Sequence, residues 1–128
     1  MKTMLKRGLP LILCASALCS SAFGIDKPAI HNGSWWKNKS GAYRDGFVSG
    51  YKSGALHSTG HTAMMNKLAT ADIVAGLDAL YKDFRNRNIT VEDALPYIAD
   101  QLSGVPDDKL NAELLHLRQT AVATEEEQ

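Results

Sequence analysis

The chain of 128 residues contains only two cysteines, Cys14 and Cys19, and both lie within its first 24 positions. Those positions carry the pattern of a cleavable export signal, so the mature protein is expected to have no cysteine. An exported chain without disulfides must hold its fold by packing alone. Because small secreted eukaryotic domains usually rely on disulfides, this absence favours a bacterial periplasmic or secreted protein.

The predicted signal peptide occupies residues 1–24. It begins with Lys2, Lys6 and Arg7, continues through an apolar run over residues 9–18, and ends in small residues before a cleavage site expected after Gly24. A retained membrane anchor is the alternative, but serine and cysteine interrupt the apolar run before it reaches the roughly 20 residues that span a bilayer. We therefore expect no stable membrane span after cleavage.

A strong charge of either sign is also missing. The whole chain has 14 Lys and Arg against 14 Asp and Glu, and the signal removes three of the positive residues and none of the negative ones. The slightly acidic remainder gives no electrostatic argument for binding nucleic acid or anionic membranes. Nucleic acid is therefore not an expected partner.

Sustained alternation of apolar and polar residues, which predicts half-buried strands, is absent as well. Apolar residues instead recur with helical spacing, so the predicted fold class is all-α: a compact bundle of four main helices plus a short fifth. The expected organisation is an irregular N-terminal arm over 25–39, a single helical domain over 40–122 and a frayed acidic tail over 123–128. The main helices are predicted at about 41–56, 70–85, 90–102 and 106–121, and the short one near 64–68.

The helices predicted over 70–85 and 90–102 have the clearest end signals. Thr70 is the expected cap of the helix over 70–85, whose buried stripe runs to Phe84. Thr90 with Asp93 predicts a capping-box-like start for the next helix, and Gly104 is expected to end it. Pro96 is expected to kink that helix or delay its start, because proline removes one backbone hydrogen bond.

Three glycines, Gly46, Gly50 and Gly54, lie four residues apart on one face of the first main helix. Each costs roughly 0.5 to 1 kcal/mol relative to alanine, so some other interaction should offset them. The favoured prediction is close packing of another helix of the same chain, in a groove bordered by Tyr43, Phe47 and Tyr51. The alternatives are a face for self-association or for a partner protein, and a segment that is less helical than its spacing indicates.

Other binding candidates are aromatic or basic. Adjacent tryptophans, Trp35 and Trp36, point in different directions and are hard to bury together, so one is a candidate anchor for a partner. Arg85 and Arg87 are interpreted either as positive charges at a helix end or as a clamp for a carboxylate.

Metal and catalytic motifs are weak. His57 and His61 have the spacing of metal ligands on a helix, but Gly60 weakens that helix and Ser58 replaces the glutamate of a metalloprotease. We predict no metal site there, no cofactor and no enzymatic activity.

The segments "GFVSGYKSG" and "ITVEDALPYIADQL", followed by a last helix that opens with proline, resemble uncharacterised small exported bacterial helical proteins. More distantly, the layout of 41–121 resembles periplasmic immunity proteins that neutralise cell-wall amidase effectors of type VI secretion. Proteins of this second group usually carry disulfide cysteines, which the mature chain lacks.

Together these patterns predict a non-catalytic periplasmic or exported helical interaction protein. Its partner is expected to be a protein or a small ligand, with a homodimer as one form of the interaction. The first alternative, implied by the resemblance, is an immunity-type inhibitor of a secreted cell-wall hydrolase. The second alternative is a periplasmic metal-binding protein.

Overall fold

The computed structural model describes residues 29–57 and 64–121, and over these ranges the fold is all-α with no strand. The predicted signal peptide and the predicted acidic tail lie outside the described residues. The helices are α1 (Gly33–Lys37), α2 (Gly41–Gly54), α4 (Thr70–Leu80), α5 (Val91–Leu102) and α6 (Asp107–Thr120), with short 3-10 turns η1 (Ala55–His57) and η2 (Phe84–Asn86). The predicted fold class and the four main helices are confirmed.

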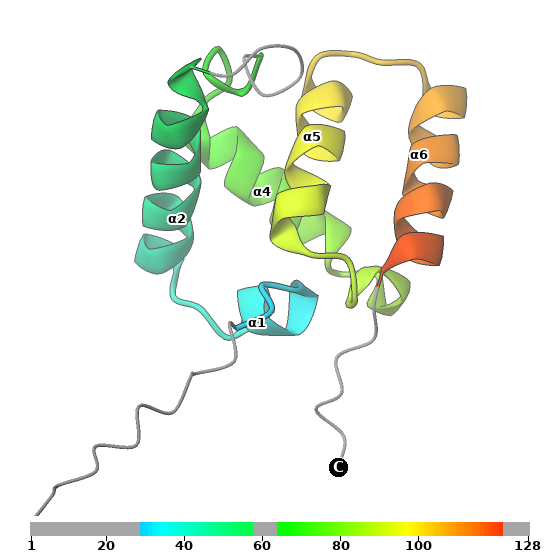
Figure 1. The fold of residues 1–128 in the computed structure, drawn as a ribbon, viewed down its shortest axis with the longest axis horizontal. Coiled ribbons are helices and arrows are strands. Elements are labelled where there is room, and N and C mark those ends of the chain that lie inside the picture. The colour runs from blue at the N-terminus through cyan, green and yellow to red at the C-terminus, as the bar shows by residue number, and fades with distance from the viewer. Residues whose placement is uncertain (1–28, 58–63, 122–128) are drawn as a thin grey trace, which may run out of the picture.

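Helix α4 lies at the centre of this arrangement. It packs against α2 on one side and α5 on the other, and α5 in turn packs against α6. As a result α2 and α6 occupy opposite edges of the molecule (Figure 1). The two edge helices contribute few buried residues, Val48 from α2 and Leu110 from α6.

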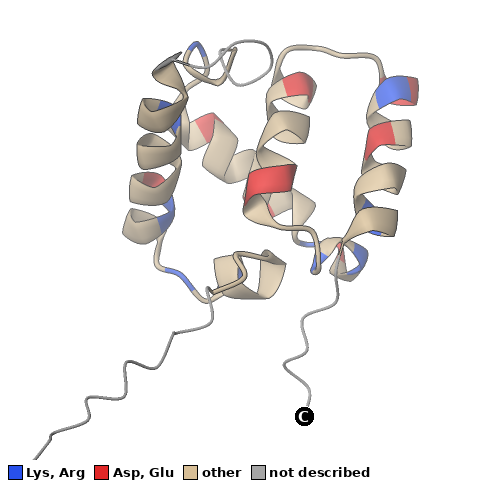
Figure 2. Ribbon diagram, viewed as in Figure 1, with Lys and Arg blue, Asp and Glu red and all other residues tan. Residues whose placement is uncertain are grey.

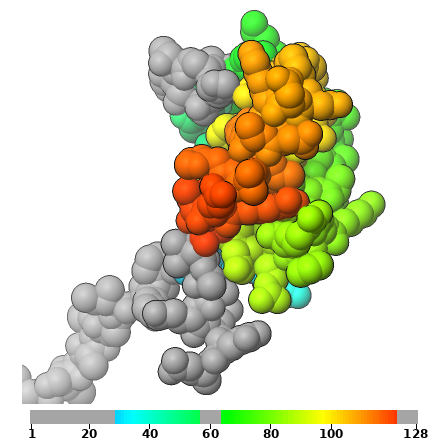
Figure 3. Space-filling model, turned by 90° about the vertical axis from the view of Figure 1, so that its right-hand side faces the viewer, coloured from blue at the N-terminus to red at the C-terminus, as the bar shows by residue number. Residues whose placement is uncertain are grey.

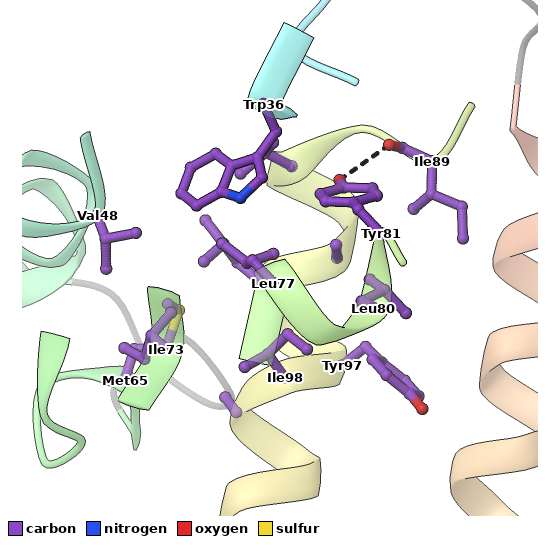
Figure 4. Close-up of a cluster of buried hydrophobic side chains, with 14 of the residues drawn as sticks. Trp36, Val48, Met65, Ile73, Leu77, Leu80, Tyr81, Ile89, Tyr97 and Ile98 are labelled. Atoms are coloured by element: carbon purple, nitrogen blue, oxygen red, sulfur yellow. Dashed lines mark hydrogen bonds between the residues drawn. The ribbon is translucent and has the colours of Figure 1, made fainter. Parts of the chain in front are cut away.

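The hydrophobic core forms where α4 and α5 cross (Figure 4). Gly76 lies at this crossing: a methyl group built on it would be 2.7 Å from Ile98 Cγ2. The close approach that the sequence analysis placed on α2 therefore occurs on α4. The largest fully buried side chains are Trp36, Met65, Ile73, Leu77, Tyr81, Ile89, Leu95 and Ile98.

The predicted irregular arm is partly wrong, because residues 33–37 form helix α1. The Asn32 side chain caps this helix by accepting a hydrogen bond from the Trp35 backbone nitrogen at 3.0 Å. A backbone bridge also joins Asn32 to Thr90 just before α5. These contacts tie the arm to the domain and place Trp36, only 1% exposed, in the core.

The helix predicted over 70–85 begins and ends differently from expectation. Ala69 is its N-cap and Thr70 is its first helical residue, so Thr70 is not the cap. The helix stops at Leu80 because the Asn86 side chain donates to the Leu80 carbonyl at 2.8 Å and the chain then turns into η2. Phe84, predicted to be buried, is consequently 73% exposed.

Helix α5 agrees closely with its sequence signals. The Thr90 hydroxyl accepts a hydrogen bond from the Asp93 backbone nitrogen, as predicted. Gly104, with φ of 81°, ends the helix in a Schellman motif, in which Val105 N donates to Asp100 O. Pro96 lies inside the helix and does not delay its start at Val91.

Candidate interaction surface

The three glycines of α2 face away from the rest of the described structure. Gly46, Gly50 and Gly54 are all exposed, and a methyl group built on any of them meets no described atom within 4 Å. The prediction that another helix of this chain packs closely against them is therefore wrong for the described residues. The reason is orientation, because α2 turns Val48, which is fully buried, toward the core from the opposite side.

Around these glycines the outward face of α2 carries mostly small side chains. At 100° per residue, six exposed small residues fall on one continuous strip opposite Val48, and the exposed Tyr43 lies on the same strip near the start of the helix. We call the six small residues the small-residue face, and in Figure 2 the outer edge of α2 is correspondingly free of charged colour. It consists of Ala42, Gly46, Ser49, Gly50, Ser53 and Gly54.

Two long cationic side chains on the inner side attach α2 to the domain. Arg44 donates to the Trp36 carbonyl at 3.1 Å and to the Asp78 carboxylate at 3.0 Å. About two turns later Lys52 donates to the Leu68 carbonyl at 2.6 Å. Helix α2 is thus positioned firmly although its glycines weaken it as a helix.

An aromatic cluster borders the small-residue face. We use this name for His31, Trp35, Tyr43 and Phe47, whose ring centroids lie 4.3 to 5.8 Å from their neighbours. The Lys39 ammonium lies 5.0 Å from the Trp35 ring centroid and 5.2 Å from that of Tyr43. Tyr43 remains 50% exposed, so the cluster presents aromatic surface beside the glycines.

The structure separates the two adjacent tryptophans. Trp35 is half-buried in the aromatic cluster, whereas Trp36 points into the core and its indole nitrogen donates to Asp78 at 2.7 Å. The interpretation of one tryptophan as a surface anchor therefore remains available only for Trp35. Tyr51 is half-buried against the core, and burial raises the pKa of its phenol.

The two arginines predicted as a clamp do not act together. Arg85 binds Asp83 two residues earlier, with Nη2 at 2.6 Å from the carboxylate. Its hydrogen bonds hold the pKa of Asp83 at about 2. Arg87 is exposed, and its carbonyl accepts from Gly33 N at 2.9 Å. Neither side chain belongs to the aromatic cluster.

The structure describes only part of the histidine pair, His57 and His61. His61 lies outside the described residues, and the structure gives the backbone of His57 in η1 but not its side chain. Within 29–57 and 64–121, no group of three or more His, Cys, Asp or Glu residues is arranged to hold a metal ion.

Sequence reasoning missed His31 and Phe47 as surface residues. Phe47 was recognised only as a groove border, and His31 sits in the arm predicted to be irregular. His31 Nδ1 lies 2.5 Å from Glu92 Oε1, a contact between positions 61 residues apart. Local patterns carry no signal for a contact of this range.

Comparisons with known proteins give no identification. No protein-family model matches the chain. Neither curated proteins nor solved structures match it significantly. In the part of the chain that the structure describes, no helix is both long and apolar enough to cross a membrane.

Proposed function

We propose that this protein is a non-catalytic, exported helical interaction module that binds a helix of a partner protein. The observation that carries the proposal is the small-residue face of α2, which is exposed along the whole helix. Glycine and serine are poor choices for an exposed helix when stability alone is selected. A docked helix supplies the missing compensation.

The energetic argument follows from the glycines themselves. Gly46 and Gly50 lie inside α2 and together lower helix stability by roughly 1 to 2 kcal/mol, a noticeable share of the roughly 5 to 15 kcal/mol that stabilises a domain, and Gly54 is the last helical residue. Without side chains at these positions, a partner backbone can approach closely and gain dispersion contacts along its length. The stability lost in the free protein is then recovered in the complex.

The aromatic cluster supplies the second part of this surface. Tyr43 belongs to α2 and its ring packs against that of Trp35, and aromatic side chains are frequent anchors in protein interfaces. Arg44 and Lys52 fix α2 before binding, which reduces the conformational entropy lost on association. The surface therefore combines a face of small residues, an aromatic border and a rigid support.

Site-specific cross-linking tests this proposal. A photoreactive phenylalanine analogue replaces Ser53 on the small-residue face in the exported protein, and in a matched control it replaces Ala112 on the exposed side of α6. We expect a discrete cross-linked product from position 53 and none from position 112. Gly50→Leu should remove this product, whereas Ala112→Leu should leave it intact.

Each outcome has a defined meaning. A product with a secreted cell-wall hydrolase would support the narrower function of an immunity-type inhibitor. A product with a second copy would identify the face as a homodimer interface. No product from position 53, or equal products from both positions, would contradict the proposal.

A further inference from the structure

A second surface feature lies at the opposite edge of the molecule from α2. It is a cavity of about 400 Å³ between the end of α4, η2, α5 and α6. Figure 3 shows this side, where α6 adjoins the green segment that follows α4. Its polar lining is provided by Asp83, Asn86, Tyr97, Gln101, Asn111 and Arg118.

The central polar group of the cavity is the Arg118 guanidinium. Its Nε donates to Asn86 Oδ1 at 2.7 Å and its Nη2 donates to Asp83 Oδ2 at 3.1 Å. Asn86 is only 2% exposed and is itself fixed, because its amide nitrogen donates to the Leu80 carbonyl at 2.8 Å. The guanidinium is therefore oriented by a buried side chain from another element.

Two donors of Arg118 are thus used to position it, and they lie on its Nε side. The outer edge formed by Nη1 and Nη2 is a separate pair of parallel donors, which matches the two oxygens of a carboxylate. Arg85 also binds Asp83, so two arginines face one carboxylate at this end of the cavity. Two cations against one carboxylate leave a net positive charge around Asp83, while Glu113 and Asp107 act on Tyr97 of the same cavity.

The other walls suit a small organic molecule. The Tyr97 hydroxyl points away from the core residues in Figure 4. Burial raises the pKa of this phenol, with Glu113 and Asp107 adding to the effect, so the group stays neutral and can donate. The amides of Gln101 and Asn111 add donors and acceptors, and Leu114 adds apolar surface.

We infer that this cavity binds a small organic carboxylate, such as the C-terminus of a short peptide, with the carboxylate on the Nη1–Nη2 edge of Arg118. The volume lies within the range of small-molecule sites. This site is independent of the small-residue face, since it is built from the end of α4, η2, α5 and α6 and no residue of α2 lines it.

Nuclear magnetic resonance of the mature protein tests the inference with defined probes. The probes are acetyl-alanyl-alanine with a free carboxylate, its C-terminal amide, and sodium acetate against sodium chloride at equal ionic strength. The free peptide should shift the Arg118 Nε–H resonance and bind about 10- to 100-fold more tightly than the amide, the range expected for charge-assisted hydrogen bonds. Acetate should shift the same resonance in the same direction.

Two variants separate recognition from folding. Arg118→Lys keeps the positive charge but loses the paired donors of the guanidinium. It should reduce the preference for the free peptide over its C-terminal amide to less than about threefold. Asn111→Leu leaves the Arg118 anchor in place and narrows the cavity, so it should weaken peptide binding about 10-fold or more. Gln119→Leu, on the exposed side of α6 and outside the cavity lining, is the control and should bind like the unchanged protein.

Equal binding of acid and amide would overturn the inference. So would the absence of an Arg118 Nε–H shift with both acetate and the peptide, or unchanged binding in Asn111→Leu. None of these outcomes would change the result of the cross-linking test on α2, so the carboxylate site and the partner-binding face can be contradicted independently.

Discussion

Helices α2 and α5 differ in how their residues serve the fold. Helix α5 buries six of its 12 residues, is capped by Thr90 and ends in the turn at Gly104. Helix α2 has 14 residues, buries only Val48, and exposes four glycines to open space. The residues of α5 are therefore accounted for by their contribution to the stability of the fold, whereas the outward residues of α2 are not.

The difference indicates where to look for function. A helix can be retained by its own packing, as α5 is, or by a few strong attachments, as α2 is through Arg44 and Lys52. In the second case the outward-facing residues of the helix contribute little to the stability of the fold. Their composition then reports on what the surface contacts, and in α2 that composition is nearly uniform in size.

The largest expected effect compares the two adjacent tryptophans, one in the core and one in the aromatic cluster at the surface. Trp36→Ala should reduce the free energy of unfolding by about 3 to 5 kcal/mol, because the side chain is 1% exposed and bonded to Asp78. Trp35→Ala should cost less than about 2 kcal/mol, since that ring is only half-buried. Denaturant unfolding of both variants measures the contrast, and equal losses would contradict the different placement of the two rings.

The second prediction concerns the close crossing of α4 and α5 at Gly76. Gly76→Ala should destabilise the protein by a net of about 1 to 2 kcal/mol, because the added methyl lies 2.7 Å from Ile98 Cγ2. Overpacking of this kind costs typically 1 to 3 kcal/mol, while the gain in helix propensity is at most about 1 kcal/mol. The measurement is urea unfolding at constant protein concentration. A more stable variant would show that α4 and α5 can separate without loss.

The third prediction compares two threonines at helix starts. Thr90→Ala should lower the unfolding free energy by about 1 kcal/mol, because it removes the side-chain cap of α5. Thr70→Ala should change it by less than about 0.5 kcal/mol, since Thr70 is already inside α4 and Ala69 is the cap residue. Thermal unfolding of the pair checks this, and a larger effect at Thr70 would reverse the assignment of caps.

These cases also show what sequence patterns can predict. Thr90, Asp93 and Gly104 act through contacts within a few residues, so their roles were visible in the sequence. The end of α4 was not, because the Asn86 amide that caps Leu80 lies in a segment whose apolar spacing continues to Phe84. The helical spacing of apolar residues continues past Leu80, although the helical hydrogen bonding of α4 ends there.

The candidate site was predicted only in part for a similar reason. The spacing of Gly46, Gly50 and Gly54 correctly places them on one face of a helix, but spacing does not determine whether that face is turned inward. The contact of Arg118 with Asn86 joins positions 32 residues apart, which no local pattern encodes. Orientation and long-range pairing both depend on the packing of the whole domain.

The smallest expected effect is the most direct test of the comparison between α2 and α5. Gly50→Ala should stabilise the free protein by up to about 1 kcal/mol, because alanine is the better helix former and its methyl meets no described atom within 4 Å. Cross-linking from position 53 should decrease in the same variant, because the added methyl keeps a docked helix at a greater distance. Unfolding is measured at several protein concentrations. A destabilisation that is independent of concentration would mean that the face is covered within the chain, whereas a loss that grows on dilution would place its contact between two copies.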